Sequence, residues 1–448
     1  MQNNKSLPIT LVLPPLRSLA AFILKLEPLW LGLMVYYFWF PIEIRWHWLW
    51  LLGGVPLVFL ARFIVHGRIF TRFPLDLLLL TFLALAVLNL YLSPFTYTNP
   101  FSRLYLLARP LLGVLLCIAF VEQVRRQRKL DALLLATLAL SLLIALLALT
   151  GSQWNNKSTQ LLFFINLLPR FTIFPGAEGG FNANEIAGAL AWITPLCAAL
   201  AALRWDQTLS RPWLQRSLKW GFRLAFVLSF LALFLGQSRF ALAGVLAALA
   251  LLAFLLIPRW RGRLLAWALI AAVALLEVLI MRNVFAPANQ IVMEQRDTES
   301  MNIRFDIWNS AFDILRDYPW TGVGMNLFRD AKVRDLYPVP SFPQPILPHA
   351  HNEFLQIAAD LGIPGLLVYT GWYIVLILAL WHIYRRATLH NLRLLAAGVV
   401  MALLAHGFYG FGDAITLWDR LAFVYWWILA LGCAAYTLHN LQKLQKIN

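Results

Sequence analysis

The chain has 448 residues, of which 61% are hydrophobic and only 13% are charged, and its mean hydropathy is +0.70. This composition excludes an ordinary soluble protein of this length and indicates an all-α polytopic membrane protein. The formal net charge of +16 does not indicate a nucleic-acid partner, because most of the basic residues fall in short clusters between apolar runs. Membrane topology explains such clusters better.

Two further observations limit the class of protein. Cys117, Cys197 and Cys433 each lie inside an apolar stretch without pairing or metal-ligand spacing, so the sequence predicts neither disulfides nor a zinc site. Residues 1–27 carry basic residues around a run that is broken by Pro14-Pro15, which is not typical of a cleavable signal peptide. We expect this segment to be a cytoplasmic or interfacial lead-in.

Twelve apolar runs are long enough, or nearly so, to cross a membrane. We expect them near residues 28–42, 46–64, 74–92, 104–121, 131–150, 184–203, 219–236, 240–257, 264–281, 363–383, 394–412 and 421–438. The chain then divides into an N-terminal membrane region of about nine helices (1–281), a large loop with short amphipathic helices (282–362) and a C-terminal membrane region of about three helices (363–448).

Lysine and arginine are distributed unequally between successive connections. With the N-terminus inside, every connection from an even to an odd span is basic, as at Arg125 and Arg126, whereas the opposite short connections hold one or two basic residues each. Because positive residues stay on the cytoplasmic side, this pattern predicts a multi-pass inner (plasma) membrane protein with both termini cytoplasmic. Residues 151–183 and 282–362 would then face the periplasmic or outer side.

The second outward segment contains a predicted helix and a predicted extended segment. Between Asn302 and Tyr318, apolar residues recur on one stripe, which favours an amphipathic helix that ends before Pro319. Five prolines between Tyr337 and Pro348 predict a stiff, extended strap that leads to His349 and His351. Gly322-Val-Gly324 is interpreted as a turn rather than a nucleotide loop.

Residues 349–366 are the stretch around which the chain is organised. Asn352 is a good helix N-cap, Glu353 suits the positive end of the helix dipole, and Gly362 and Pro364 supply stop signals before the next span. His351 then lies just ahead of a helix N-terminus, where the partial positive charge disfavours imidazolium and keeps the ring in the form that a general base needs. The alternative is a capped helix with an incidental histidine.

The same stretch resembles a family signature. His351-Asn352, nine residues, and then Gly362-x-x-Gly365 resemble the motif of the O-antigen ligase family, membrane glycosyltransferases related to O-antigen polymerases and protein O-oligosaccharyltransferases. The family motif usually closes with threonine, whereas this chain has Leu366. The resemblance implies a glycan donor on a polyprenyl diphosphate and an acceptor hydroxyl, for example on a glycolipid similar to the lipid A core, beside membrane lipids.

Such a donor has an anionic leaving group, so its site needs arginine near the outer face. Arg239 follows a very short outer turn and partly resembles the family's second motif, although Leu242 stands one place early; the alternative is an interfacial anchor. Arg304 could contact the substrate or pair with Trp308 one turn on. Arg109 is the third candidate, because an ionisable group inside a span is functional by default unless it snorkels outward.

Amides and a further histidine complete the predicted site. Asn184 lies in an Asn-x-Asn stretch before the sixth span, and with Asn352 and His349 it could bind sugar hydroxyls, although Asn184 could equally be a helix cap. His406 and Asp413 stand seven apart on the eleventh predicted span, hence on one face, and could form a supporting pair.

The predicted reaction is one displacement with inversion, in which His351 accepts the proton of the acceptor hydroxyl while Arg239 and Arg304 stabilise the departing diphosphate. We expect no cofactor and no metal. His349-x-His351 could instead ligate a metal, but no third ligand stands out near them in the sequence.

Two other classes remain open. A small-anion transporter, for example of bicarbonate, is the first, although the sequence has no internal repeat and no pair of interrupted spans in matching halves. An O-antigen polymerase or a protein O-oligosaccharyltransferase is the second. The acceptor distinguishes these enzymes, and the sequence does not show it.

Overall fold

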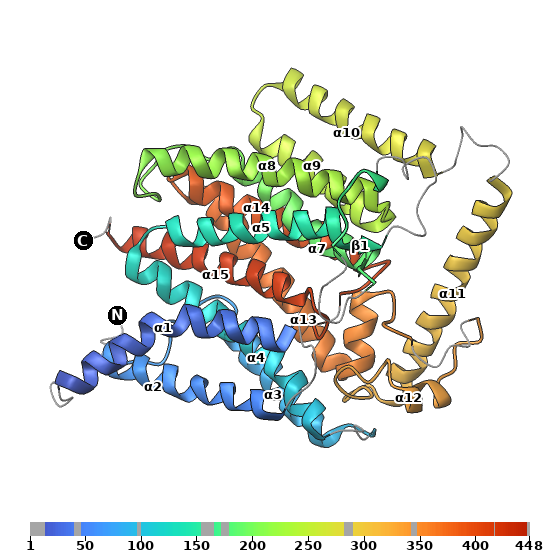
Figure 1. Cartoon of the computed structure of the whole chain (residues 1–448), viewed down its shortest axis with the longest axis horizontal. Coiled ribbons are helices and arrows are strands. Elements are labelled where there is room, and N and C mark those ends of the chain that lie inside the picture. Colours follow the sequence, from blue (N-terminus) through green and yellow to red (C-terminus); the bar gives the residue numbers. More distant parts are fainter. Residues whose placement is uncertain are drawn as a thin grey trace.

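A computed structural model describes residues 14–39, 46–95, 100–153, 165–171, 179–281, 290–341, 347–415 and 417–445. Within them the chain forms fourteen α-helices, one short 3₁₀-helix and two short strands, which confirms the predicted all-α polytopic fold (Figure 1). Ten of these helices are long and apolar enough to cross a membrane, and the shorter apolar segments Trp50–His66 and Asp76–Leu92 accompany them. Each of the twelve predicted spans therefore has a helical counterpart.

Ten helical elements precede the long polar segment. They are α1 (Pro14–Trp39), η2 (Trp46–Gly53), α2 (Gly54–His66), α3 (Asp76–Leu92), α4 (Pro100–Gln127), α5 (Asp131–Gly151), α7 (Ala183–Leu200), α8 (Pro212–Gly236), α9 (Arg239–Leu256) and α10 (Trp260–Met281). Residues 14–27, expected to be a lead-in, form the first part of α1, so the helix of the predicted first span extends backwards from residue 28. Prolines in the first turn of a helix lack only N–H groups that would have no intrahelical acceptor, so Pro14-Pro15 begins the helix instead of breaking it.

The remaining elements are α11 (Gln290–Asp317), α12 (Ala331–Leu336), α13 (Glu353–Arg386), α14 (His390–Tyr409), α15 (Ala422–Gln445), and the parallel strands β1 (Ser152–Gln153) and β2 (Phe181–Asn182). The predicted helix Asn302–Tyr318 is the C-terminal part of the longer α11. Residues 154–164 and 172–178 of the first outward segment lie outside the described residues.

Most of the long helices lie roughly along one direction, and α11, α12 and the first part of α13 gather at one end of the bundle (Figure 1). The start of α1 and the end of α15 lie at the opposite end (Figure 1). Both described chain ends are thus remote from the predicted outer loop. Which end of the bundle faces the cytoplasm stays a prediction.

The elements α11, α12 and the first part of α13 form a loop subdomain with its own small core. The apolar stripe of α11 supplies Ile307, Ala311 and Ile314, all of which are buried. They pack with Val323, Phe328, Val333, Val339, Leu347, Ala350 and Ala359. The apolar stripe of α11 therefore packs against the first part of α13, as the buried face of an amphipathic helix does. Residues 342–346, the middle of the predicted strap, lie outside the described residues.

A kink divides α13 where the stop signals were predicted. Gly362 has φ of 70° and ψ of −172°, and the N–H of Ile363 donates to the carbonyl of Pro319 at 2.7 Å instead of to a helical partner. The turn at Gly322 approaches from the other side, where Val323 N–H donates to the Ala359 carbonyl at 2.8 Å. The helix before Gly362 is therefore held by the loop subdomain, and the helix after it enters the bundle.

Gly362→Ala is expected to destabilise the protein by about 1–3 kcal/mol, because an alanine would be strained at this φ. Its Cβ would also lie 2.7 Å from the carbonyl oxygen of Pro319. Thermal unfolding in detergent measures the effect. Gly371→Ala on the same helix is the matched control, because a Cβ there meets only Leu78 at 3.6 Å, an ordinary contact. Equal unfolding midpoints for the two variants would contradict the kink as a required feature.

Candidate active site

The two histidines of the 349–351 segment stand immediately before α13. Asn352 is the N-cap, as predicted, and its Oδ1 accepts the N–H of Leu355 at 3.0 Å. Its Nδ2 donates to the carbonyl of Phe411 at 3.4 Å, so the amide also joins the start of α13 to the turn after α14. Substrate binding by Asn352 stays a prediction.

A chain of buried hydrogen bonds holds this segment against the loop subdomain. The N–H of Ala350 donates to Gln356 Oε1 at 2.7 Å, and Gln356 Nε2 donates to Asp360 Oδ2 at 2.8 Å. Asp360 Oδ1 accepts the N–H of Phe328 at 3.0 Å. The sequence does carry a signal for this pair, since two polar residues four apart interrupt the apolar start of α13.

His351 faces a carboxylate that is distant in the sequence. Its Nδ1 lies 3.2 Å from Asp413 Oδ1, and its φ of 47° turns the chain sharply before the helix. Since a carboxylate only accepts, Nδ1 carries the proton of this hydrogen bond, and in the neutral ring Nε2 keeps its lone pair. The side chain of His351 is 26% exposed whereas that of Asp413 is 6% exposed, so the imidazole is accessible and its partner is buried.

His349 completes the cluster. Its Nδ1 accepts the N–H of His351 at 3.2 Å, its Nε2 lies 3.6 Å from Asp413 Oδ1, and the two imidazole rings are 4.3 Å apart. Burial lowers the pKa of His349 to about 4, against the opposing charge of Asp413, so the ring is neutral near pH 7. Its contacts are with the protein, and its predicted role in substrate binding is not tested by them.

Asp413 is ionised at any physiological pH. Burial raises the pKa of its carboxyl, but the hydrogen bond with His351 and the basic groups around the carboxyl, Arg304 among them, outweigh burial and lower that pKa to about 2. The carboxylate can therefore fix the tautomer of His351 and stabilise an imidazolium that forms there, as the third member of a catalytic triad does.

The predicted pairing of His406 with Asp413 is wrong. α14 ends at Tyr409 and the chain turns through Gly410 and Gly412, so the helical spacing that would place the two side chains on one face does not reach Asp413. His406 is fully buried and binds Glu353 instead, with Nε2 at 2.7 Å from Glu353 Oε2.

His406 and Glu353 form a second polar cluster, which is more deeply buried than that of His349, His351 and Asp413. His406 Nδ1 lies 3.1 Å from the carbonyl of Gly188 and must donate to it, and the ring stacks on Trp192 with centroids 3.5 Å apart. Tyr369 donates its hydroxyl to Glu353 Oε1. Glu353 was predicted only as a favourable charge at a helix N-terminus; its buried partners, which fix the first turn of α13, were missed.

Arg304 lies close to the cluster, and Arg239 stands at the start of α9, whose second residue, Phe240, packs beside the cluster. The guanidinium of Arg304 lies 5.7 Å from the ring centroid of Phe240, not over Trp308 as the alternative expected, and its charge acts on Asp413. A Cβ on Gly412 would lie 2.1 Å from the ring of Phe240, so that ring is packed against the residue before Asp413. Arg239 is the exposed first residue of α9, next to Phe240. The structure thus brings both arginines to the end of the bundle that holds His351.

Arg109 belongs to a neighbouring polar group. It is 8% exposed, its Nε donates to the carbonyl of Phe38 at 2.6 Å, and its guanidinium lies 5.3 Å from the Tyr105 ring. Asp419 is close enough to act electrostatically on Arg109 and pairs with Arg329 at 3.0 Å. Sequence analysis missed Arg329 and Asp419, which no local motif marks.

Asn184 stands at the start of α7, near the same end. Its carbonyl accepts the hydroxyl of Tyr409 at 3.1 Å, and its N–H donates to Asn182 Oδ1 at 2.8 Å. Asn182, not Asn184, is therefore the cap of α7. The side chain of Asn184 remains a predicted substrate contact.

The donor atoms of the cluster are also spaced as metal ligands are. One donor atom each of His349, His351 and Asp413 lie within 4.8 Å of one another, so the expectation that no third ligand lies near the histidines is wrong. Two imidazoles and one carboxylate are a donor set that suits Zn²⁺. The same three residues also bind one another directly, since His351 forms a hydrogen-bonded pair with Asp413 and its N–H donates to His349. This arrangement needs no metal.

One part of the chain matches a known protein family. Residues 224–370 match the family described as O-antigen ligase. This stretch is an O-antigen ligase domain. It covers about a third of the chain and confirms the resemblance that the His351-Asn352 and double-glycine motif indicated. A search of curated proteins finds no match.

The O-antigen ligase domain includes Arg239, Arg304, His349, His351 and Asn352 but ends before α14. Asp413, the partner of His351, therefore lies outside the matched stretch, as do Arg109, Asn184 and His406. The protein is therefore a multi-pass membrane protein in which residues 224–370 match the O-antigen ligase family.

Proposed function

We propose that this protein is an inverting glycosyltransferase that moves a glycan from a polyprenyl diphosphate to an acceptor hydroxyl at the outer face of the membrane. The observation that carries the proposal is the accessible His351 held by the buried carboxylate of Asp413, within a chain that contains an O-antigen ligase domain. The geometry is that of a base positioned by a third group.

The proposed reaction is a single displacement. Nε2 of His351 takes the proton of the acceptor hydroxyl as its oxygen forms a bond to the anomeric carbon of the glycan. The bond from that carbon to the diphosphate oxygen breaks, and the electron pair leaves with the diphosphate. Arg304 and Arg239 stabilise the charge that develops there, and Asp413 stabilises the imidazolium. Attack opposite the leaving group inverts the anomeric configuration.

Arg304→Gln is expected to lower the turnover of glycan transfer by about 10²–10³-fold, the usual cost of removing a charge aimed at a developing anion. Arg304→Lys should recover part of the loss, since lysine keeps the charge without the bidentate fork. Transfer is measured with purified protein at saturating donor. Arg316→Gln on the exposed side of α11 is the matched control. Equal activity of Arg304→Gln and the control would remove Arg304 from the site.

We propose that transfer needs no metal, because the arginines can stabilise the diphosphate and a positioned imidazole can deprotonate the hydroxyl. Transfer should therefore persist at the same rate after dialysis against a chelator. The cluster of His349, His351 and Asp413 makes this test informative. Loss of transfer in chelator with restoration by Zn²⁺ alone would overturn the metal-independent mechanism and assign the three residues as ligands.

The acceptor is tested by offering each class to the protein in turn: a glycolipid similar to the lipid A core, a growing glycan and a protein with exposed serine or threonine. We expect the glycolipid to accept, as in a ligase, whereas transfer to the glycan or the protein would favour a polymerase or an oligosaccharyltransferase. Uptake of bicarbonate into proteoliposomes without any transfer would favour the transporter.

A further inference from the structure

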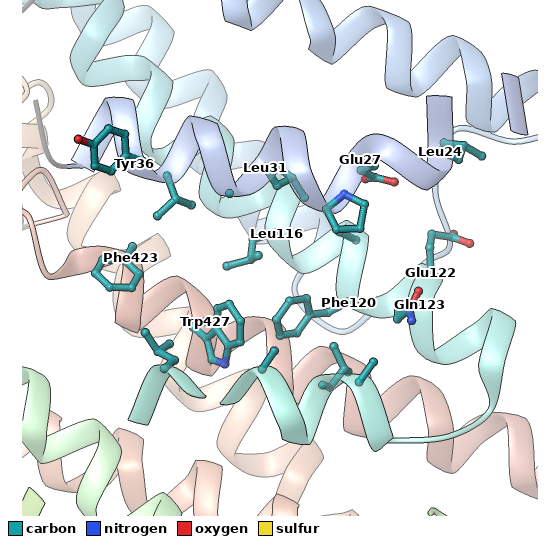
Figure 2. Close-up of a pocket in the computed structure, with 18 of the residues that line it drawn as sticks. Leu24, Glu27, Leu31, Tyr36, Leu116, Phe120, Glu122, Gln123, Phe423 and Trp427 are labelled. Carbon is teal, nitrogen blue, oxygen red and sulfur yellow. The ribbon is translucent and has the colours of Figure 1, made fainter. Parts of the chain in front are cut away.

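A cleft of about 800 Å³ lies between α1, α4, α5 and α15, with α2 at one end (Figure 2). Apolar side chains line most of it: Leu31 and Val35 from α1, Leu116 and Phe120 from α4, Leu140 and Leu147 from α5, and Phe423 and Trp427 from α15. It follows α5 from Ala132 to Leu147, which is ~22 Å at the rise of an α-helix and exceeds half of the ~30 Å hydrocarbon core of a bilayer. Its shape suits a long apolar chain lying along the bundle.

Charged residues gather at one end of this cleft. Lys25, Glu27, Arg62, Glu122 and Arg126 line that end. The two carboxylates already have basic partners: Glu27 pairs with Arg62, and Glu122 lies 3.6 Å from Arg68 and 3.7 Å from Arg125, neither of which lines the cleft. The remaining charge at the cleft is positive, from the exposed side chains of Lys25 and Arg126.

Arg62 gives the second, independent indication of a ligand. Its side chain is 3% exposed and lines the cleft, and only one of its guanidinium nitrogens meets Glu27. Among the described residues, its Nε and Nη1 are buried without a hydrogen-bond partner. Buried guanidinium nitrogens without acceptors are costly, and an anionic oxygen would satisfy them.

We propose that this cleft binds a phospholipid with an anionic headgroup, with its phosphate at Arg62, Lys25 and Arg126 and an acyl chain along the apolar wall. The charged end lies where α4 ends and α5 begins, at the end of the bundle opposite α11 and the first part of α13, which His351 directly precedes (Figure 1). The diphosphate of a glycan donor that reacts at His351 cannot lie there at the same time. The ligand is therefore a lipid of the other leaflet, distinct from the proposed donor.

The test measures which lipid the full-length protein retains. Protein is purified from nanodiscs made of equal amounts of phosphatidylglycerol and phosphatidylcholine, and the tightly retained phospholipid is counted and identified by native mass spectrometry. We expect retention of phosphatidylglycerol over phosphatidylcholine by about tenfold or more, because both headgroups offer a phosphate to Arg62 but only phosphatidylcholine brings a cation close to Lys25 and Arg126. No retained phospholipid, or equal retention of the two headgroups, would overturn the proposal.

Two variants separate the acyl chain from the headgroup. Ala136→Trp fills the cleft and should abolish retention, whereas Ala139→Trp, an exposed position of α5 that does not line the cleft, should retain lipid as the wild type does. The double variant Lys25→Gln/Arg126→Gln removes the two exposed positive charges and leaves the Glu27–Arg62 pair intact, so it should keep a lipid but lose the headgroup preference. Equal retention by both tryptophan variants, or an unchanged preference in the double variant, would contradict the assignment. None of these readouts depends on glycan transfer.

Discussion

Replacing His351 with alanine is expected to lower the turnover of glycan transfer by about 10²–10⁴-fold, the range that a positioned general base contributes. The imidazole is accessible and directed by Asp413, and His349, the other histidine of the described cluster, has both ring nitrogens engaged with protein groups. The measurement is the initial rate of transfer by purified protein, with donor and acceptor both saturating.

His382→Ala is the matched control, because His382 is exposed on the last turns of α13, past the kink and toward the other end of the same helix. The control should transfer at the wild-type rate. A His351→Ala protein that folds, binds donor and transfers as fast as the His382→Ala protein would show that the base lies elsewhere.

Asp413→Asn is expected to lower turnover by about 10²-fold or more with little change in the KM for the donor. An amide nitrogen can donate to His351 Nδ1 and so favours the wrong tautomer, and a neutral side chain does not stabilise the imidazolium that forms during transfer. A fall in turnover alone is the expected signature, because this carboxylate acts on the base rather than on the bound substrate.

Asp317→Asn is a suitable control for this variant, since Asp317 is an exposed carboxylate that accepts the hydroxyl of Tyr337 at 2.6 Å within the loop subdomain. A merely structural role for Asp413 predicts instead a lower unfolding midpoint with unchanged turnover per folded molecule. That result would remove the dyad from the mechanism.

Local signals in the sequence predicted much of the frame that positions the site. The twelve apolar runs became helices, Asn352 caps α13, and Gly362 breaks it, because each of these features depends on residues within one or two turns. The start of α1 was misplaced for a local reason as well, since a proline pair can begin a helix or break it.

The polar contacts of the site were less predictable because they join distant parts of the chain. His351 and Asp413 stand 62 residues apart, and Glu353 and His406 stand 53 apart. The pattern assigned Asp413 to the helix of His406, but the glycines after Tyr409 end that helix and turn Asp413 toward the loop subdomain. No periodicity within one helix could indicate this exchange of partners.

The most direct test of the central claim measures the release of free polyprenyl diphosphate by the wild-type protein, with and without an acceptor. Release should require both the acceptor and His351, and should equal the amount of glycosylated product, as one displacement demands. Release of diphosphate without acceptor, or equal product from the His351→Ala protein, would contradict transfer by an imidazole base.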